Sequence, residues 1–165
     1  MMAPEELGRL IDEHAAALTL YARQWCAAPE DVVQDGFLKL AGLTSAPPHV
    51  VPWLYAVVRN AAISAARSAR RRREREIAAA RAPTWFVPTE GDGLDAVDAT
   101  AALGRLPLEE REVIVAHLWG GLTFDEIGRL IGASAATAHR RYAAGLTVLR
   151  TQMGVVCPHP PPTRT

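Results

Sequence analysis

The sequence predicts an all-α protein made of two small helical domains joined by a flexible linker, the second domain ending in a helix-turn-helix. Helix-forming alanine, leucine, arginine and glutamate dominate the chain, and runs of β-branched residues are few. Apolar residues recur at three- and four-residue intervals over two long stretches. Between them, residues 82–98 are rich in proline, glycine and acids and lack any period. We therefore expect domains at 1–81 and 99–153, with a linker at 82–98 and a disordered, proline-rich tail at 154–165.

The charges of this 165-residue chain are segregated, although its formal net charge is zero. Residues 67–81 contain seven arginines and two glutamates, whereas all the charged residues of the linker are acidic. Local charge, rather than the total, steers binding to nucleic acid. The basic stretch is expected to neutralise phosphates, although a solvated basic end of a helix would have the same composition.

Patterns typical of catalysis or metal binding are missing from the sequence. Cys26 and Cys157 lie far apart, and the five histidines are scattered singly. We therefore expect no catalytic residue, no metal site and no cofactor. The first residues carry acids without the apolar core of a signal peptide, and no run approaches the length of a membrane span. A reduced, cytoplasmic chain is the expected setting.

Three helices are predicted in the first domain. The first covers residues 5–26, with a wide apolar face, and the second covers residues 29–41 and is closed by Gly42. Residues 43–51 contain a Pro-Pro pair and no helical period, which predicts a loop. A third helix is predicted to begin at Pro52 and to continue to Arg81, and its arginine-rich outer half cannot be buried.

The second domain is predicted to begin with two further helices. One covers about residues 94–106, and the next opens at Pro107. The second of these is expected to turn Val113, Ile114, Leu118 and Trp119 inward before Gly120 and Gly121 stop it.

Residues 122–150 carry the signals of a helix-turn-helix. Thr123 and Glu126 form a capping box, which predicts a helix beginning at Phe124. Gly132 supplies the left-handed position that ends this helix, and Ser134 is the N-cap of the next one. Two helices joined by so short a glycine-containing turn are typical of this motif.

The second helix of this motif is the candidate DNA-reading element, because the N-terminal part of the corresponding helix contacts base edges in helix-turn-helix proteins. Its apolar residues are expected to face inward, which turns Thr137, His139, Arg140 and Arg141 outward. An ordinary helical hairpin with a solvated basic face remains open as the alternative at this point.

Several motifs taken in order resemble the sigma-70 family, and more narrowly its small extracytoplasmic-function (ECF) sigma factors. The resemblance covers about residues 5–150. It rests on Glu30-Asp31-Val32-Val33-Gln34-Asp35-Gly36-Phe37, Trp53-Leu54-Tyr55 through Arg59-Asn60, the arginine run, Leu106-Pro107 with Arg111, and the motif from Thr123 to Leu149.

The resemblance implies that the chain binds core RNA polymerase, through the β′ coiled coil and the β flap, and gives the enzyme promoter specificity. An anti-sigma factor is a further implied partner. The loop at residues 43–51 matches the segment that captures an extruded base of the −10 element. The implied site residues fall into three sets. For core polymerase they are Asp31, Gln34, Asp35, Phe37 and Leu38. For the −10 element they are Trp53, Arg59, Asn60, Arg67, Arg70 and Arg71. For the −35 element they are Thr123, Ser134, Thr137, His139, Arg140 and Arg141.

The chain departs from the family pattern at a few positions. Gly36 replaces a bulkier residue at an interior helical position, and Ser64 replaces an aspartate. Ala143 and Ala144 stand where the family often carries His-Arg, so one phosphate contact of the −35 helix is expected to be missing.

Three alternatives come from other functional classes. A stand-alone helix-turn-helix regulator would bind duplex DNA by itself, usually as a dimer. A non-initiating polymerase-binding protein would retain its function without Arg140 and Arg141. An enzyme is the least supported alternative, because no nucleophile, paired-carboxylate or phosphate-loop pattern occurs.

Overall fold

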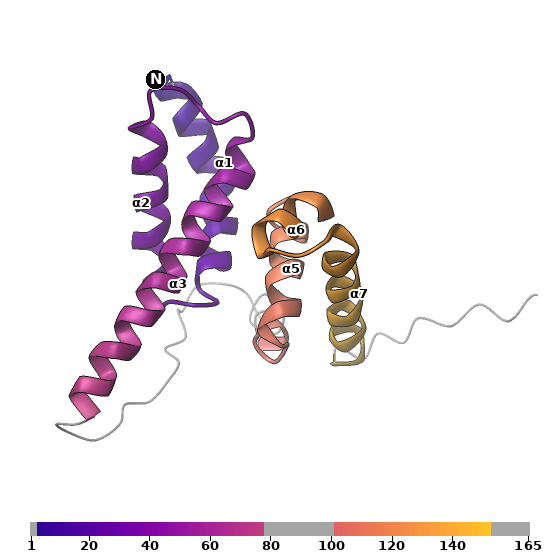
Figure 1. Ribbon diagram of the computed structural model, residues 1–165. Helices are drawn as coiled ribbons and strands as arrows, with labels where there is room; N and C mark the ends of the chain where they lie inside the picture. Colours follow the sequence, from indigo (N-terminus) through magenta and orange to yellow (C-terminus); the bar gives the residue numbers. More distant parts are fainter. Residues whose placement is uncertain (1–2, 78–100, 153–165) are drawn as a thin grey trace, which may run out of the picture.

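The computed structural model describes residues 3–77 and 101–152, which form helices and connecting turns without a strand among them (Figure 1). This confirms the predicted all-α class. Residues 101–104 are also helical. The named helices are α1 (Pro4–Ala22), α2 (Pro29–Ala41), α3 (Val50–Ile77), α5 (Leu108–Leu118), α6 (Phe124–Ile131) and α7 (Ala135–Gln152).

Helix α1 ends four residues before the predicted end at Cys26. The N–H groups of Gln24 and Trp25 donate to the carbonyls of Tyr21 and Ala22 at 3.3 and 3.1 Å. These bonds reach back three residues, which is the tighter pattern of a closing turn. The chain therefore reverses here and reaches α2, which begins at Pro29.

Helix α2 has the predicted bounds and the predicted buried face. Val33, Phe37 and Leu40 are buried, and Gly42 is the C-cap. Gly36 is buried as well, and a Cβ added to it would lie 3.1 Å from a methyl group of Val58 in α3. This glycine therefore permits the close approach of the two helices, a benefit that offsets its lower helix propensity.

Helix α3 begins at Val50, two residues before the predicted start. The N–H of Trp53 donates to the carbonyl of His49 at 3.1 Å, so Pro52 falls within the first turn, where its missing N–H costs little. Leu54 and Val58 are buried in the first half of the helix. The arginine-rich half continues past α1 and α2, which together with α3 form the first unit; α5, α6 and α7 form the second unit (Figure 1). Residues 78–81 of the predicted helix and the predicted linker lie outside the described residues.

Helix α5 corrects one prediction. Val113 and Ile114 are buried as expected, but Leu118 and Trp119 are 52% and 45% exposed. Helix α5 packs against α7 and also against α1 of the first unit. Because two sides of the helix are covered, its buried positions form the continuous run 112–116 instead of a single stripe. The exposed pair lies beyond that run, at the C-terminal end of the helix.

The predicted helix-turn-helix is confirmed in its local details. Thr123 caps α6 in a complete capping box with Glu126, and Gly132 has a left-handed φ of 70°. The hydroxyl of Ser134 accepts from the N–H of Thr137 at 3.1 Å, so it caps α7.

One apolar core runs through both units. Leu18 of α1 and Leu54 of α3 belong to the same buried cluster as Ile114 of α5 and Ile127 of α6. Gly120 allows a close approach of the two units, because a Cβ there would lie 2.5 Å from the hydroxyl oxygen of Tyr55. The two halves of the chain therefore pack directly against each other.

The described part of the chain was searched for membrane-spanning helices and for metal sites. None of its helices is long and apolar enough to cross a membrane. Within the same residues, no group of three or more His, Cys, Asp or Glu side chains is placed to hold a metal ion.

Two glycine variants test the packing of the helix-turn-helix. A Cβ at Gly128 would meet the carbonyl oxygen of Ala133 at 2.8 Å and the backbone nitrogen of Ala135 at 3.0 Å. Backbone atoms cannot move aside, so Gly128→Ala should destabilise the protein by about 1–3 kcal/mol. The control Gly8→Ala, with no atom within 4 Å of the added Cβ, should stabilise α1 by about 0.5–1 kcal/mol. Urea unfolding measures both, and equal effects would contradict this packing.

The capping box predicts a pH-dependent contribution to stability. Hydrogen bonds from the backbone N–H of Thr123, and then from its hydroxyl, hold the pKa of Glu126 below its ordinary value. The carboxylate therefore stabilises the fold above its unfolded pKa of about 4.3, and this contribution is lost as the pH falls through the lower folded pKa. Glu126→Gln should reduce stability at pH 7 and lose this effect at pH 3. Asp125→Asn, outside the capping box, is the control. A deficit that is equal at both pH values would refute this role for the charge.

Candidate nucleic-acid interface

The N-terminal part of α7 presents the predicted DNA-reading side chains on one surface. His139 and Arg140 are exposed, and Thr137 is partly exposed. The two capping residues, Thr123 and Ser134, are exposed at the starts of α6 and α7. The positive end of the α7 dipole lies at this surface and favours a phosphate.

Two members of the predicted −35 set are also held by contacts within the second unit. Arg141 is only partly exposed and pairs with Glu109 of α5 at 2.7 Å. The ring of His139 stands edge-on to Phe124, with 5.1 Å between centroids. Arg140 is therefore the exposed arginine at the start of this helix.

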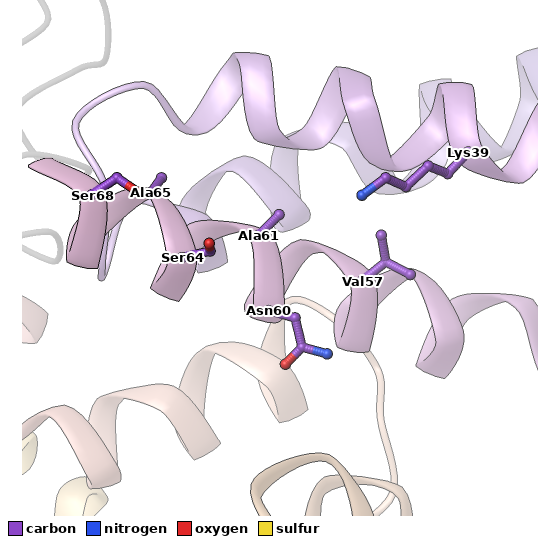
Figure 2. A pocket seen from close by; sticks show the side chains of 7 residues that line it. All are labelled: Lys39, Val57, Asn60, Ala61, Ser64, Ala65 and Ser68. Carbon is purple, nitrogen blue, oxygen red and sulfur yellow. The ribbon is translucent and has the colours of Figure 1, made fainter.

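A second candidate surface is a shallow, open hollow of about 570 Å³ between α2 and α3 (Figure 2). Asn60 of the predicted −10 set lies here beside Ser64, the residue that departs from the family pattern. Lys39 reaches the hollow from α2, whereas the other lining residues come from α3. The hollow thus combines an ammonium group, an amide and hydroxyls, all of which can bond to phosphates or bases.

The arginines farther along α3 form an exposed basic surface. Arg67, Arg70 and Arg71 are all exposed. Arg70 pairs with Glu74 one turn away at 3.5 Å, and Arg71 donates to the hydroxyl of Ser68 at 3.3 Å. Such exposed intrahelical contacts are weak, so these guanidinium groups remain available to phosphates.

Arg59 and Trp53 of the predicted −10 set lie between the two units. The Nε of Arg59 donates to a carboxylate oxygen of Glu112 at 2.6 Å, and the guanidinium lies 5.9 Å from the ring centroid of Trp25. The Arg59 side chain is only 24% exposed. Trp53 lines a second hollow of about 290 Å³, together with residues of the 43–51 loop and of α6.

The electrostatics around Glu112 keep this cluster hydrogen-bonded. The hydroxyl of Tyr21 donates to the same oxygen of Glu112 at 2.8 Å. Burial, and then the charge of Glu112, raise the pKa of Tyr21 well above its ordinary value, so the phenol stays protonated as a donor. Burial works against the ionisation of Arg59, but its hydrogen bond with Glu112 and the charge of that carboxylate raise its pKa overall.

The predicted polymerase-binding set lies on one side of α2, with a single exception. Asp31, Gln34, Asp35 and Leu38 are exposed, and Leu38 is 61% exposed, which is unusual for a leucine of a packed helix. Phe37 instead belongs to the apolar core, so its side chain supports the helix and presents no binding surface.

Two residues of the candidate surfaces were missed from the sequence. Lys39 is an isolated cation on α2, and no local pattern connects it with α3. Glu112 directly precedes the buried apolar run Val113-Ile114-Val115 of α5, and an acid next to such a run was a signal of a buried partner. The partner itself could not be named without the tertiary structure.

Family models match both units. Residues 10–72 match the model of sigma-70 region 2, and residues 97–149 match that of sigma-70 region 4. The first match contains the α2 and α3 surfaces, and the second contains the helix-turn-helix.

Individual relatives agree with these matches. The ECF RNA polymerase sigma factor SigL of Mycobacterium tuberculosis strain H37Rv is 32% identical over 152 residues, covering 86% of this chain and 85% of the relative. The fold is similar to that of the sigma factor RpoE of Bartonella quintana, solved with the anti-sigma factor NepR, at a TM-score of 0.70, 20% identity, and coverage of 94% of this chain and 100% of that one. The fold is also similar to that of CnrH, solved with the cytosolic domain of CnrY. Here the TM-score is 0.62 and the identity is 22%, and the match covers 94% of this chain and 92% of that one. The chain belongs to the sigma-70 family of RNA polymerase sigma factors, in its ECF group.

Proposed function

We propose that this ECF sigma factor binds core RNA polymerase and directs it to start transcription at specific promoters. One observation carries the proposal: a single chain matches both sigma regions and exposes a helix-turn-helix surface as well as a separate acidic and apolar side of α2. In this proposal, residues 1–81 bind polymerase and the −10 element, and residues 99–153 bind the −35 element. The chain is then a non-catalytic specificity subunit that acts in the cytoplasm.

In the proposed division of roles, α7 reads the −35 element in the major groove. Arg140 is the candidate for a bidentate contact with guanine, and Thr137 and His139 flank it. The exposed caps of α6 and α7, Thr123 and Ser134, are the candidates for phosphate contacts. Arg141 reaches DNA in this scheme only after leaving Glu109.

In the same scheme, α3 holds the melted −10 strand. Asn60 bonds a base edge in the hollow between α2 and α3, and Arg67, Arg70 and Arg71 neutralise phosphates along the exposed helix. The loop at residues 43–51 takes the extruded base, whose unstacking costs a few kcal/mol that a shaped pocket must offset.

Core polymerase binds α2 in this proposal, through Asp31, Gln34, Asp35 and Leu38. An exposed leucine on the same side of α2 as Asp31 and Asp35 suits a basic partner helix that also makes an apolar contact. The β flap is the proposed contact of the second unit. The structural neighbours were solved with anti-sigma partners, and we propose a partner of that class for this chain as well.

A second candidate function is polymerase binding without initiation. Ala143 and Ala144 are exposed on α7 and offer no charge where the family pattern often has His-Arg. With one phosphate contact absent, −35 binding loses part of its sequence-independent affinity. Such a chain would occupy polymerase without locating promoters.

The polymerase contact is tested by reversing one charge on α2. Asp35→Arg should weaken binding to purified core RNA polymerase at least about tenfold, which corresponds to about 1.4 kcal/mol, because a cation would then face a basic partner. Asp12→Arg is the matched control, since it makes the same charge change at an exposed position of α1. Fluorescence anisotropy with labelled protein measures both affinities. Equal affinities for the two variants would remove α2 from the proposed interface.

The −35 contact is tested with a pair of arginines on α7. In the assembled holoenzyme, Arg140→Ala should reduce the preference for the correct base at one −35 position by about 1–3 kcal/mol, the worth of a bidentate contact with guanine. Arg150→Ala removes an exposed arginine near the other end of the same helix and should leave that preference unchanged. Competition binding to promoter duplexes with single base changes gives the preference. A uniform loss over all duplexes would reassign Arg140 to the phosphate backbone.

A further inference from the structure

The two units are joined through one buried carboxylate. Glu112 of α5 is 5% exposed, and both of its side-chain hydrogen bonds go to the first unit. Its donors are the guanidinium of Arg59 on α3, at 2.6 Å, and the hydroxyl of Tyr21 on α1, at 2.8 Å. No donor from the second unit contacts this side chain among the bonds of the described residues. These protein donors therefore reach the carboxylate only while the two units are packed together.

This contact favours the packed arrangement in a specific way. A buried charge that loses its partner is strongly destabilising, whereas the same charge in water is not. When the units separate, Glu112 and Arg59 both return to solvent, so neither is left as a buried, unpaired charge. The pair therefore acts on the equilibrium between packed and separated units rather than on the stability of either unit.

The packed arrangement also carries a cost, which makes it reversible. The hydroxyl of Tyr55 is buried next to Gly120 and has no hydrogen-bond partner within the described residues. An unsatisfied buried hydroxyl opposes closure, because separation would return it to water. The packed form, which we call the closed form, therefore depends on a balance. The hydrogen bonds of Glu112 favour it, and the unsatisfied hydroxyl of Tyr55 opposes it.

The packed arrangement covers one set of proposed DNA-binding residues and leaves others open. Arg59 is bound to Glu112, and Trp53 lies in the hollow shared with Arg129 and Leu130 of α6. In contrast, Arg140 on α7 stays exposed, as does the acidic side of α2. Closure therefore covers part of the −10 surface while leaving the proposed polymerase surface free.

We propose that Glu112 is an autoinhibitory residue that occupies the place of a DNA phosphate at Arg59 and holds the free protein in the packed form. The proposal rests on the function proposed above, in which Arg59 and Trp53 contact the melted −10 strand. Polymerase binds the open α2 surface first, and the −10 strand then replaces Glu112 at Arg59 as the units separate.

The test measures the distance between the units in the full chain. Spin labels are placed through Ala69→Cys in α3 and Thr147→Cys in α7, both at exposed positions, in a background with Cys26→Ser and Cys157→Ser. Double electron–electron resonance should give one short distance for this parent protein. Glu112→Gln and Arg59→Gln should each raise the ratio of separated to packed molecules at least about tenfold. The separated molecules should give a broad distribution of longer distances. Glu109→Gln is the matched control, because its ion pair with Arg141 lies within the second unit, and it should keep the short distance.

A binding measurement separates masking from mere packing. The probe is a fluorescein-labelled single-stranded 20-nucleotide DNA of random sequence at low salt. Glu112→Gln should bind it several-fold more tightly than the parent, whereas Arg59→Gln should show no gain although it opens equally, because the released arginine is missing. Circular dichroism verifies that each variant keeps its helices.

Two results would overturn the proposal. One is an unchanged distance in both Glu112→Gln and Arg59→Gln. The other is an opened Glu112→Gln variant with unchanged affinity for the probe, since closure would then mask nothing. Failure of the parent protein to bind core polymerase would overturn the proposed function instead, and it would leave the distance measurements as they are.

Discussion

The burial of the Glu112 carboxylate is the constraint on which the arrangement of the two units depends. A charge removed from water needs charged or polar partners at short range, and both partners of this one lie on the first unit. The apolar cluster around it spans helices of both units, but apolar contact is non-directional and tolerates many relative positions. The bonds from Arg59 and Tyr21 select one of them. Apolar packing thus provides the buried surface between the units, and the hydrogen bonds of Glu112 fix their relative position.

The same logic explains how a chain without net charge can bind DNA. Two of its acids pair with arginines that lie far from them in the sequence: Glu112 pairs with Arg59, and Glu109 pairs with Arg141. Arg70 and Arg71 of outer α3 make exposed, weak contacts along their own helix. Two grades of basic side chain result, one exposed and one already paired with a carboxylate. A phosphate must compete for the second grade, so a sequence-independent encounter with DNA would first engage the exposed arginines.

Local signals predicted the elements, and tertiary contacts decided what they could not. The capping box at Thr123, the left-handed Gly132 and the cap at Ser134 act within a few residues, so the helix-turn-helix could be read from the sequence. The exposure of Trp119 could not, because it depends on α1 covering a second side of α5. Likewise, a glycine inside a helix lowers the stability of that helix, and the reason for Gly36 becomes clear only from its contact with Val58 of α3. Helical period also predicted the exposure of most proposed site residues on α2 and of His139 and Arg140 on α7. It could not predict the pairing of Arg59 with Glu112, because these residues are 53 positions apart.

Transcription from a library of genomic fragments, by core RNA polymerase with and without this protein, decides whether the protein directs initiation. We expect discrete new start sites that need the protein and that share one −35 and one −10 sequence at a fixed spacing. Such sites would establish initiation and identify the promoter in the same experiment. Stable binding to polymerase without any new start site would contradict the account and favour the non-initiating alternative. Absence of binding altogether would contradict it more deeply and favour a DNA-binding regulator that acts without polymerase.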